Sequence, residues 1–242
     1  TPIHYQDKTG KWKDYDNSLS LTPTSNQDTL AGYQSNNELN VRFGANTASE
    51  KLVRLSDGEY NTIGFEESLD ALQWTKLLEE SKGVKSVVYH GICIGAATGM
   101  YAITHENCPD CVKGIVTEGM FVNFRESMKN HLIERNRNFF PVLHCIDFWM
   151  KHYTGHSMRK GPIDVIDKLN RPILMLQSKE DPYSTAVNAQ KLFDRCQTEN
   201  KKLILFEHGA HSMLRITDTQ QYDRCITDFL TDLFSTQAQP VE

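Results

Sequence analysis

A five-residue segment, Gly91-Ile92-Cys93-Ile94-Gly95, restricts the fold of this chain more than any other feature. It follows an apolar run, Val84 to Tyr89, that predicts a buried strand, and it precedes small residues, Ala96 to Gly99, that predict a closely packed helix. Glycine on both sides of the cysteine indicates that the strand and the helix approach so closely that side chains would clash. We therefore expect a sharp turn that projects Cys93 into solvent at the start of a helix, where unpaired N–H groups and the helix dipole favour a thiolate.

Segments typical of strands and helices alternate from about residue 66 onward. Apolar runs predict further strands at Val112 to Thr117, Ile173 to Gln177 and Leu203 to Phe206. One predicted helix ends at Gly83, and the last spans Tyr222 to Phe234. The apolar face expected on the first of these helices consists of Leu69, Leu72, Trp74, Leu77 and Leu78. This alternation is typical of an α/β fold, in which a mostly parallel sheet is covered on both faces.

Two polar loops follow the last two predicted strands. The first is Ser178-Lys179-Glu180-Asp181-Pro182, and the second is Glu207-His208-Gly209-Ala210-His211-Ser212-Met213, just before the last helix. Earlier in the chain, Ser56 to Tyr60 and then Gly64 to Glu67 connect an early strand to the helix that precedes Cys93. A thiol, an acid and a histidine thus occur in this order along the chain.

These motifs and their order resemble the α/β-hydrolase superfamily, whose nucleophile lies on such an elbow between strand and helix. The resemblance covers roughly residues 54 to 234, and cysteine at the elbow is similar to the dienelactone hydrolases. It implies a single α/β-hydrolase domain over residues 1–242, with a mostly parallel sheet flanked by helices. The catalytic residues that it implies are Cys93, Asp181 and His211, with the backbone N–H of Ile94 in the oxyanion hole and Gly91 and Gly95 as the elbow glycines.

The alternation of strands and helices breaks between about Phe121 and Pro162. The resemblance implies that this segment, residues 121–162, is a helical cap over the active site. The alternative is that its large apolar side chains simply pack the core. They are Phe139, Phe140, Val142, Leu143, Ile146, Phe148, Trp149, Met150 and Tyr153.

The first 55 residues depart from the pattern of the superfamily because they are polar and contain no long apolar run. The resemblance implies two or three buried strands here and a loop, often His-Gly, that supplies the second oxyanion donor. The closest substitutes are Ala31-Gly32-Tyr33 and Phe43-Gly44-Ala45. Three explanations stay open: the strands have diverged, segments are absent from the sequence, or part of the catalytic apparatus has been lost. The last would lower the rate on the order of a hundredfold to a thousandfold.

Each proposed site residue also has an alternative interpretation. Cys93 could be a packing residue, or a replacement for a serine, and Asp181 could merely begin a turn. Glu180 is the fallback acid, and His208 competes with His211 as the base.

No metal and no cofactor are expected. Cys108-Pro109-Asp110-Cys111 is a C-x-x-C sequence without a second pair, so we interpret it as a loop with two incidental cysteines rather than a redox or metal site. The remaining histidines do not recur at the spacing of a zinc-binding helix and are interpreted as surface or cap residues. They include His131, His144, His152 and His156.

Charge and composition narrow the possible partners. The 242 residues carry a net charge of −5, which argues against a nucleic-acid surface. The sequence contains no apolar run long enough to span a bilayer, and its N-terminus lacks the basic-then-apolar pattern of a signal peptide, although a leader could have been removed. Six cysteines are too few for a disulfide scaffold, and we expect a cytoplasmic protein.

Two classes of function agree with the sequence. The first is a hydrolase that cleaves a carboxylic ester, thioester or lactone of a small-molecule acyl substrate through an acyl-enzyme intermediate. The second is a non-catalytic relative of such hydrolases that binds a small apolar ligand or a partner in its pocket.

Overall fold

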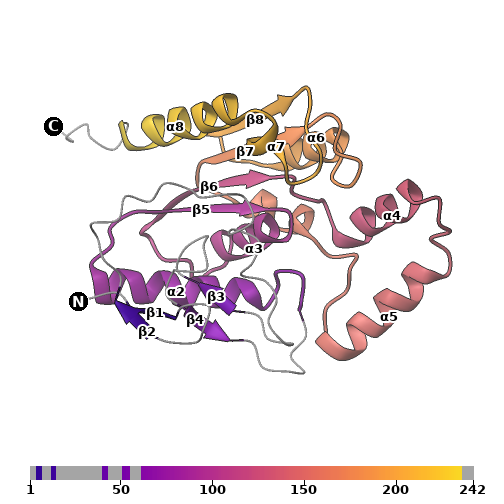
Figure 1. Ribbon diagram of the computed structural model, residues 1–242, viewed down its shortest axis with the longest axis horizontal. Helices are drawn as coiled ribbons and strands as arrows, with labels where there is room; N and C mark the ends of the chain where they lie inside the picture. The colour runs from indigo at the N-terminus through magenta and orange to yellow at the C-terminus, as the bar shows by residue number, and fades with distance from the viewer. Residues whose placement is uncertain (1–3, 7–11, 15–39, 43–50, 55–60, 236–242) are drawn as a thin grey trace. The chain divides into compact units, whose positions relative to one another are not determined.

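A four-stranded parallel sheet is the centre of residues 61–235 in the computed structural model of the protein (Figure 1). Its order is β5 (Val87–Ile92), β6 (Val112–Glu118), β7 (Ile173–Ser178) and β8 (Lys201–Phe206). Every residue of β7 is buried, as expected for a central strand of a parallel sheet that is covered on both faces. The predicted α/β architecture is confirmed.

Helices cover the two faces of this sheet because side chains of a strand point alternately to opposite faces. On one face, Ile115 and Ile173 pack with α3 (Ile94–Ile103) and α6 (Ala186–Arg195). On the other face, Val116 and Leu174 pack with α8 (Thr219–Ser235), which follows the short α7 (Leu214–Thr217). The parallel strands end at one edge, and the functional loops begin there.

The helix before the elbow, α2 (Glu67–Lys82), ends at Gly83 as expected, with this glycine in a left-handed conformation (φ 65°). The predicted apolar face is wrong, because Leu69 and Leu77 are exposed. The buried side instead contains small and polar residues, Ser68 and Thr75, beside Leu72. The hydroxyl of Thr75 forms a hydrogen bond with Tyr89 Oη at 2.8 Å. This bond allows a polar side chain to be buried between α2 and β5.

The strand that leads to the elbow lies further along the chain than predicted, at Val87–Ile92 rather than Val84 to Tyr89. Its pairing with β6 continues through Gly91 and Ile92, opposite Thr117 and Glu118. The neighbouring strand therefore extends β5 up to the nucleophile, although His90 and Gly91 interrupt the apolar pattern.

Two helices, α4 (Phe124–Glu134) and α5 (Val142–Thr154), form most of the segment that the sequence predicts as a cap. Figure 1 shows both beyond the ends of the strands, away from the sheet. Phe140, Phe148 and Trp149 are exposed, so the alternative that these rings fill the core is wrong. The segment returns to the sheet through two short 3₁₀ turns, η2 (Pro162–Asp164) and η3 (Ile166–Lys168).

The two ends of this segment meet at its base. The backbone N–H of Ile163 donates to the carbonyl of Val122 at 3.2 Å. A Cβ atom at Gly161 would overlap that same carbonyl, so glycine is required for this approach. The segment is therefore closed where it leaves and rejoins the sheet.

The chain divides into two units, residues 1–60 and residues 61–242. The structure describes residues 61–235 and, in the first unit, only the backbone of four short strands. There, β1 (His4–Gln6) pairs with β2 (Trp12–Asp14), and β3 (Asn40–Arg42) pairs with β4 (Lys51–Arg54), both antiparallel. The loops that the sequence suggested for the second oxyanion donor, residues 31–33 and 43–45, and the segment 56–60 lie outside the described residues.

Candidate active site

Cys93 lies at the junction between β5 and α3 with φ 54° and ψ −112°. A positive φ is costly for a residue with a side chain and persists only where the surroundings enforce it. Here the N–H of Cys93 donates to the carbonyl of Glu118 at 2.9 Å, and its carbonyl accepts from Ala97 at 3.2 Å. The elbow is thus held both by the next strand and by the helix that follows.

The two glycines of the elbow differ in their surroundings. A Cβ atom at Gly91 would overlap the backbone of Gly95 and Ala96, so no other residue fits there without a shift of the backbone. A Cβ atom at Gly95 would meet nothing within 4 Å, and the clash expected at this position is absent. The close approach depends on Gly91, because the first turn of α3 lies directly against this position of the strand. Ile94 is the first residue of α3, so its N–H has no acceptor within the helix.

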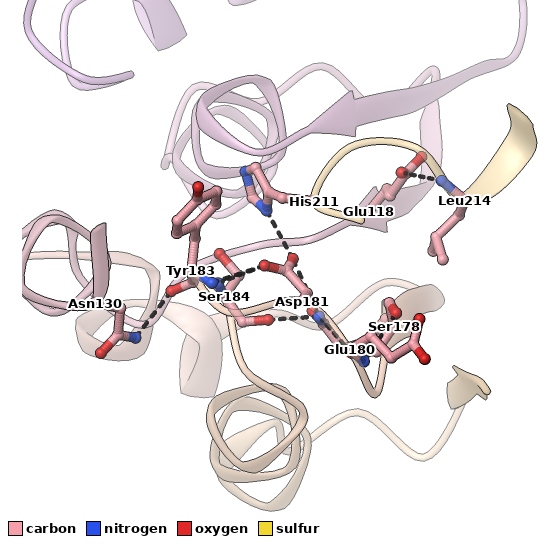
Figure 2. A network of polar contacts seen from close by, with 10 residues as sticks. Glu118, Asn130, Ser178, Glu180, Asp181, Tyr183, Ser184, His211 and Leu214 are labelled. Carbon is pink, nitrogen blue, oxygen red and sulfur yellow. Dashed lines mark hydrogen bonds and ion pairs between the residues drawn. The ribbon is translucent and has the colours of Figure 1, made fainter. Parts of the chain in front are cut away.

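The acid and the histidine of the sequence pattern meet beside the elbow. Asp181 follows β7 and His211 follows β8, and the carboxyl ends of parallel strands lie at one edge of the sheet. His211 Nδ1 lies 2.6 Å from Asp181 Oδ2 (Figure 2). Cys93 lies close enough to this imidazole for its side chain to raise the pKa of His211 through hydrogen bonding and charge. The structure therefore brings together all three residues that the sequence suggested.

The carboxylate of Asp181 is buried, with 2% of its side chain exposed, and hydrogen bonds fix its orientation. Its Oδ1 accepts from the N–H groups of Tyr183 at 2.8 Å and Ser184 at 3.0 Å, which leaves Oδ2 for the imidazole. Burial alone would raise the pKa of Asp181, but the hydrogen bonds from His211, Ser184 and Tyr183 outweigh burial and lower it. The acid therefore stays ionised beside His211.

His211 is 13% exposed. Burial alone would lower the pKa of this imidazole, but the hydrogen bonds and charges of Asp181 and Cys93 raise it to about 10. The acid and the thiol thus both favour the protonated form of this imidazole.

The two alternative residues form a separate pair on the surface. His208 Nδ1 lies 2.9 Å from Glu180 Oε1, with 77% and 55% of the two side chains exposed. Glu180 raises the pKa of His208 through a hydrogen bond and its charge. The other oxygen of Glu180 accepts from the N–H of Gly209 at 3.2 Å, so this pair joins the acid loop to the histidine loop.

Sequence reasoning missed Glu118, the last residue of β6. Its carbonyl holds the N–H of Cys93, while its buried side chain reaches the histidine loop. Oε1 accepts from the N–H of Leu214 at 3.1 Å (Figure 2), and Oε2 accepts from the hydroxyl of Tyr222 at 2.9 Å. Tyr222 also lies 2.9 Å from His90 Nε2. The one available signal in the sequence was a carboxylate at the end of an apolar strand.

Cys93 borders an apolar cluster. Cys93 and Ile94 pack against buried residues that include Ala97 and Phe121, and Phe65, Phe124 and Met150 pack against the same group. Phe124 comes from α4 and Met150 from α5. Both helices therefore contribute to the apolar cluster that Cys93 joins.

The helix α4 also contacts the acid loop. Asn130 Nδ2 donates to the carbonyl of Tyr183 at 3.0 Å (Figure 2), and the ring of His131 stacks on that of Tyr183 with centroids 3.5 Å apart. The ring of Tyr183 in turn meets His211 edge to face at 5.5 Å. The imidazole of His211 and α4 are thus connected through one tyrosine.

The C-x-x-C segment forms no disulfide, since Cys108 and Cys111 are both free. Arg171 Nη1 donates to the sulfur of Cys108 at 2.7 Å, and burial raises the pKa of both thiols. Within residues 61–235 and the four short strands, no group of three His, Cys, Asp or Glu side chains could hold a metal ion. No helix in this part of the chain is long and apolar enough to cross a membrane.

Comparisons with known proteins agree with this geometry. No protein-family profile matches the chain. The uncharacterized protein YqkD of Bacillus subtilis (strain 168) is 28% identical over 182 residues, which cover 74% of this chain and 59% of YqkD. The Pyrococcus furiosus esterase Pf2001 superposes with a TM-score of 0.57 at 14% identity, over 73% of this chain and 66% of the esterase. A lipase-esterase related protein from Clostridium acetobutylicum gives a TM-score of 0.50 at 15% identity, over 72% of this chain and 78% of that protein. The chain spans less than two thirds of YqkD and of Pf2001.

Proposed function

We propose that this chain, which has the α/β-hydrolase fold, cleaves a carboxylic ester, thioester or lactone through Cys93, His211 and Asp181. The observation that carries this proposal is the continuous contact of sulfur, imidazole and carboxylate at the edge of the sheet. Pf2001 is an esterase, and the Clostridium protein is described as related to lipases and esterases, which supports ester cleavage as the reaction class.

In the first step, the sulfur of Cys93 attacks the carbonyl carbon of the substrate while His211 holds the proton that the thiol has lost. The new C–S bond moves the carbonyl electrons onto oxygen, and the N–H of Ile94 donates to this oxyanion. The tetrahedral adduct then collapses, the bond to the leaving group breaks, and His211 gives its proton to that group. A thioester between the acyl group and Cys93 remains.

In the second step, water gives a proton to His211 and attacks the thioester carbonyl. The C–S bond breaks, the acid is released, and the sulfur and the protonated imidazole are restored. Asp181 fixes the orientation of the ring throughout, because it accepts from Nδ1 and leaves the opposite nitrogen towards the sulfur. No metal or cofactor takes part in either step.

The apolar cluster supports an apolar acyl group. Phe65, Phe121, Phe124 and Met150 belong to the apolar cluster that Cys93 borders, so a hydrocarbon chain bound against them would lose its contact with water. Because Phe124 and Met150 belong to α4 and α5, we infer that residues 121–162 act as the cap that roofs the site and selects the acyl group.

The experiment measures hydrolysis of short-chain nitrophenyl esters and of acyl thioesters while iodoacetamide alkylates the protein. The test uses the Cys145→Ser variant, because Cys145 is an exposed thiol that would otherwise react as well. We expect turnover to disappear in step with alkylation of Cys93, followed by mass spectrometry, and Cys93→Ala to be inactive.

A folded protein that turns over no ester or thioester, and whose Cys93 reacts at the rate of an ordinary thiol, would contradict the proposal. That result would favour a non-catalytic protein that binds an apolar ligand. Cys93→Ser is the matched variant for the nucleophile, since a gain in ester turnover with serine would indicate a scaffold suited to oxygen.

A further inference from the structure

The helix α5 presents large apolar side chains to solvent. Val142, Ile146 and Trp149 recur at the spacing of one helix face, with 42%, 37% and 52% exposed. Phe148 and Phe140, the latter just before the helix, are 63% and 66% exposed. We refer to these five residues as the α5 apolar surface. Single exposed apolar residues are ordinary, but a contiguous set on one element marks an interaction site.

The rings on this surface are held in place by one another. Phe148 meets Trp149 edge to face at 5.4 Å, and Trp149 stacks on Tyr153 at 5.6 Å. Phe140 packs against His144 at 5.4 Å. Elsewhere on the helix, Leu143 is fully buried. The rings of this surface are therefore packed against one another rather than being independent side chains.

The charge around this surface has the opposite sign to that of the whole chain. Residues 124–160 contain seven Lys or Arg and three Asp or Glu, a net charge of +4, whereas the chain carries −5. One acid of this segment, Asp147, is paired with Arg159 at 2.9 Å. Exposed bases are present on the connection between the two helices, Arg135 and Arg137, and on α5, Lys151.

We propose that the α5 apolar surface and the basic side chains around it form a docking site for an anionic lipid membrane, with α5 lying in the plane of the headgroups. Aromatic side chains are favoured at this depth, because their apolar faces enter the acyl boundary while polar edges stay hydrated. Nearby Lys and Arg side chains are attracted to acidic headgroups. The docking is a surface adsorption and is independent of the proposed catalysis.

The shape and the charge of the surface distinguish a membrane from other occupants. A helix of 13 residues is about 20 Å long, so its exposed apolar side chains can lie along one lipid surface. A second copy of the chain would place two segments of charge +4 against each other, which is unfavourable. An anionic and apolar partner satisfies both properties.

The experiment measures flotation of the full chain with vesicles of phosphatidylcholine alone and of phosphatidylcholine with phosphatidylserine in a ratio of about 7 to 3. We expect binding to the second composition only, with an affinity that falls as salt is added. The fluorescence of Trp149 should shift to the blue on binding, and Trp149→Phe should bind normally but lose this part of the shift.

Variants separate the apolar and the electrostatic contributions. The double variant Phe148→Ser, Trp149→Ser should lower vesicle affinity at least about tenfold. Arg135→Gln and Arg137→Gln should each lower it about fivefold. Val187→Ser, which removes an exposed apolar side chain on α6, is the matched control and should bind as the unmodified protein does. Circular dichroism and thermal midpoints verify that each variant folds.

Three results would overturn the proposal. The first is equal binding, or no binding, to the two vesicle compositions. The second is a concentration-dependent dimer that the Phe148→Ser, Trp149→Ser variant abolishes, because this would identify the surface as an interface between copies. The third is binding to polyglutamate that equals binding to vesicles and needs the same aromatic residues, because this would indicate an acidic protein partner. These experiments read out vesicle binding and not ester hydrolysis, so failure here leaves the proposed activity untouched.

Discussion

Two histidines, three residues apart in one loop, each pair with one of two adjacent carboxylates in another. His211 with Asp181 and His208 with Glu180 have nearly equal separations, 2.6 Å and 2.9 Å. The first pair is almost buried and the second is largely exposed. The same two chemical groups therefore occur in two environments within a few residues, and the environment alone distinguishes them.

The comparison shows what burial adds to an ion pair. Water screens the exposed pair, and pairs of that kind contribute little to stability. The buried pair lies where the field of each charge is stronger, and Asp181 is further fixed by two backbone N–H groups. Only the buried imidazole also contacts the thiol of Cys93. Burial thus turns a common surface contact into a group that can hold and transfer a proton.

The largest expected difference between the pairs is in catalysis. His211→Ala should lower kcat/KM for ester cleavage at least about a thousandfold, because nucleophile, base and acid act as a unit. His208→Ala should change it by less than about twofold, since an exposed histidine away from the sulfur takes no part in proton transfer. Steady-state kinetics on the same ester tests both variants. Equal losses in the two would show that the loop as a whole, and not the contact with Cys93, supports activity.

The carboxylates should differ in the same direction. Asp181→Asn should lower kcat on the order of a hundredfold to a thousandfold, because an amide can present its NH₂ group to the imidazole and favour the wrong tautomer. Its remaining oxygen still accepts from Tyr183 and Ser184, so the loop keeps its shape. Glu180→Gln serves as the matched variant and should keep nearly full activity. A large loss in Glu180→Gln with an active Asp181→Asn would reverse the assignment of the acid.

The pH dependence should report the buried pair alone. The pKa of His211 is raised to about 10, so the protonated imidazole that donates to the leaving group is lost as pH rises through about 10. We expect kcat/KM to decline there and the same decline in His208→Ala. A rate that rises towards pH 10 instead would mean that the neutral imidazole is the active form.

The same raised pKa predicts a contribution to stability. Because the folded pKa of His211 exceeds its unfolded value, the stabilisation is fully present below about pH 6.5 and disappears as pH rises through about 10. The thermal midpoints of the unmodified protein and of His211→Gln should therefore converge at the alkaline end. A gap between the two midpoints that widens with pH would contradict the assigned direction.

A smaller effect is expected at Glu118, which positions the loop that carries His211. Glu118→Gln removes the charge and replaces one of two acceptor oxygens with a donor, so Leu214 and Tyr222 can no longer both donate to this side chain. We expect a loss of about 1–3 kcal/mol in the free energy of unfolding and about a tenfold fall in kcat with little change in KM. Tyr222→Phe removes one of these bonds without touching the histidine loop and should cost stability but little activity. A fall in kcat of the same size in Tyr222→Phe would show that Glu118 acts only through stability.

The sequence located the parts of the site that depend on local patterns. Cys93, Asp181 and His211 each follow a short apolar strand, and the carboxyl ends of parallel strands converge whatever the details of their packing. The left-handed end of α2 at Gly83 is likewise a local property. These predictions needed no knowledge of which side chains meet across the fold.

Other features depend on contacts between distant segments and could not be predicted from local pattern. Glu118 bonds to Leu214 and Tyr222, which lie 96 and 104 residues away. Thr75 lies on the buried face of α2, where its hydroxyl bonds to Tyr89 Oη. The spacing of apolar residues therefore predicted the wrong face of this helix. The sequence pattern predicts a steric clash for a side chain at either Gly91 or Gly95, but only Gly91 has one. Glycine flanks Cys93 on both sides, and this pattern does not indicate which of the two positions is crowded.

The closed base of the segment between β6 and β7 makes that segment a detachable module. Its two ends are joined at Val122 and Ile163, so a short turn between these positions could replace everything in between without moving either strand. A protein shortened in this way would keep the thiol, the imidazole and the carboxylate at the edge of the sheet while the segment between Val122 and Ile163 is replaced. Exchange of this insertion for another, by evolution or by engineering, could therefore change which molecules reach the site.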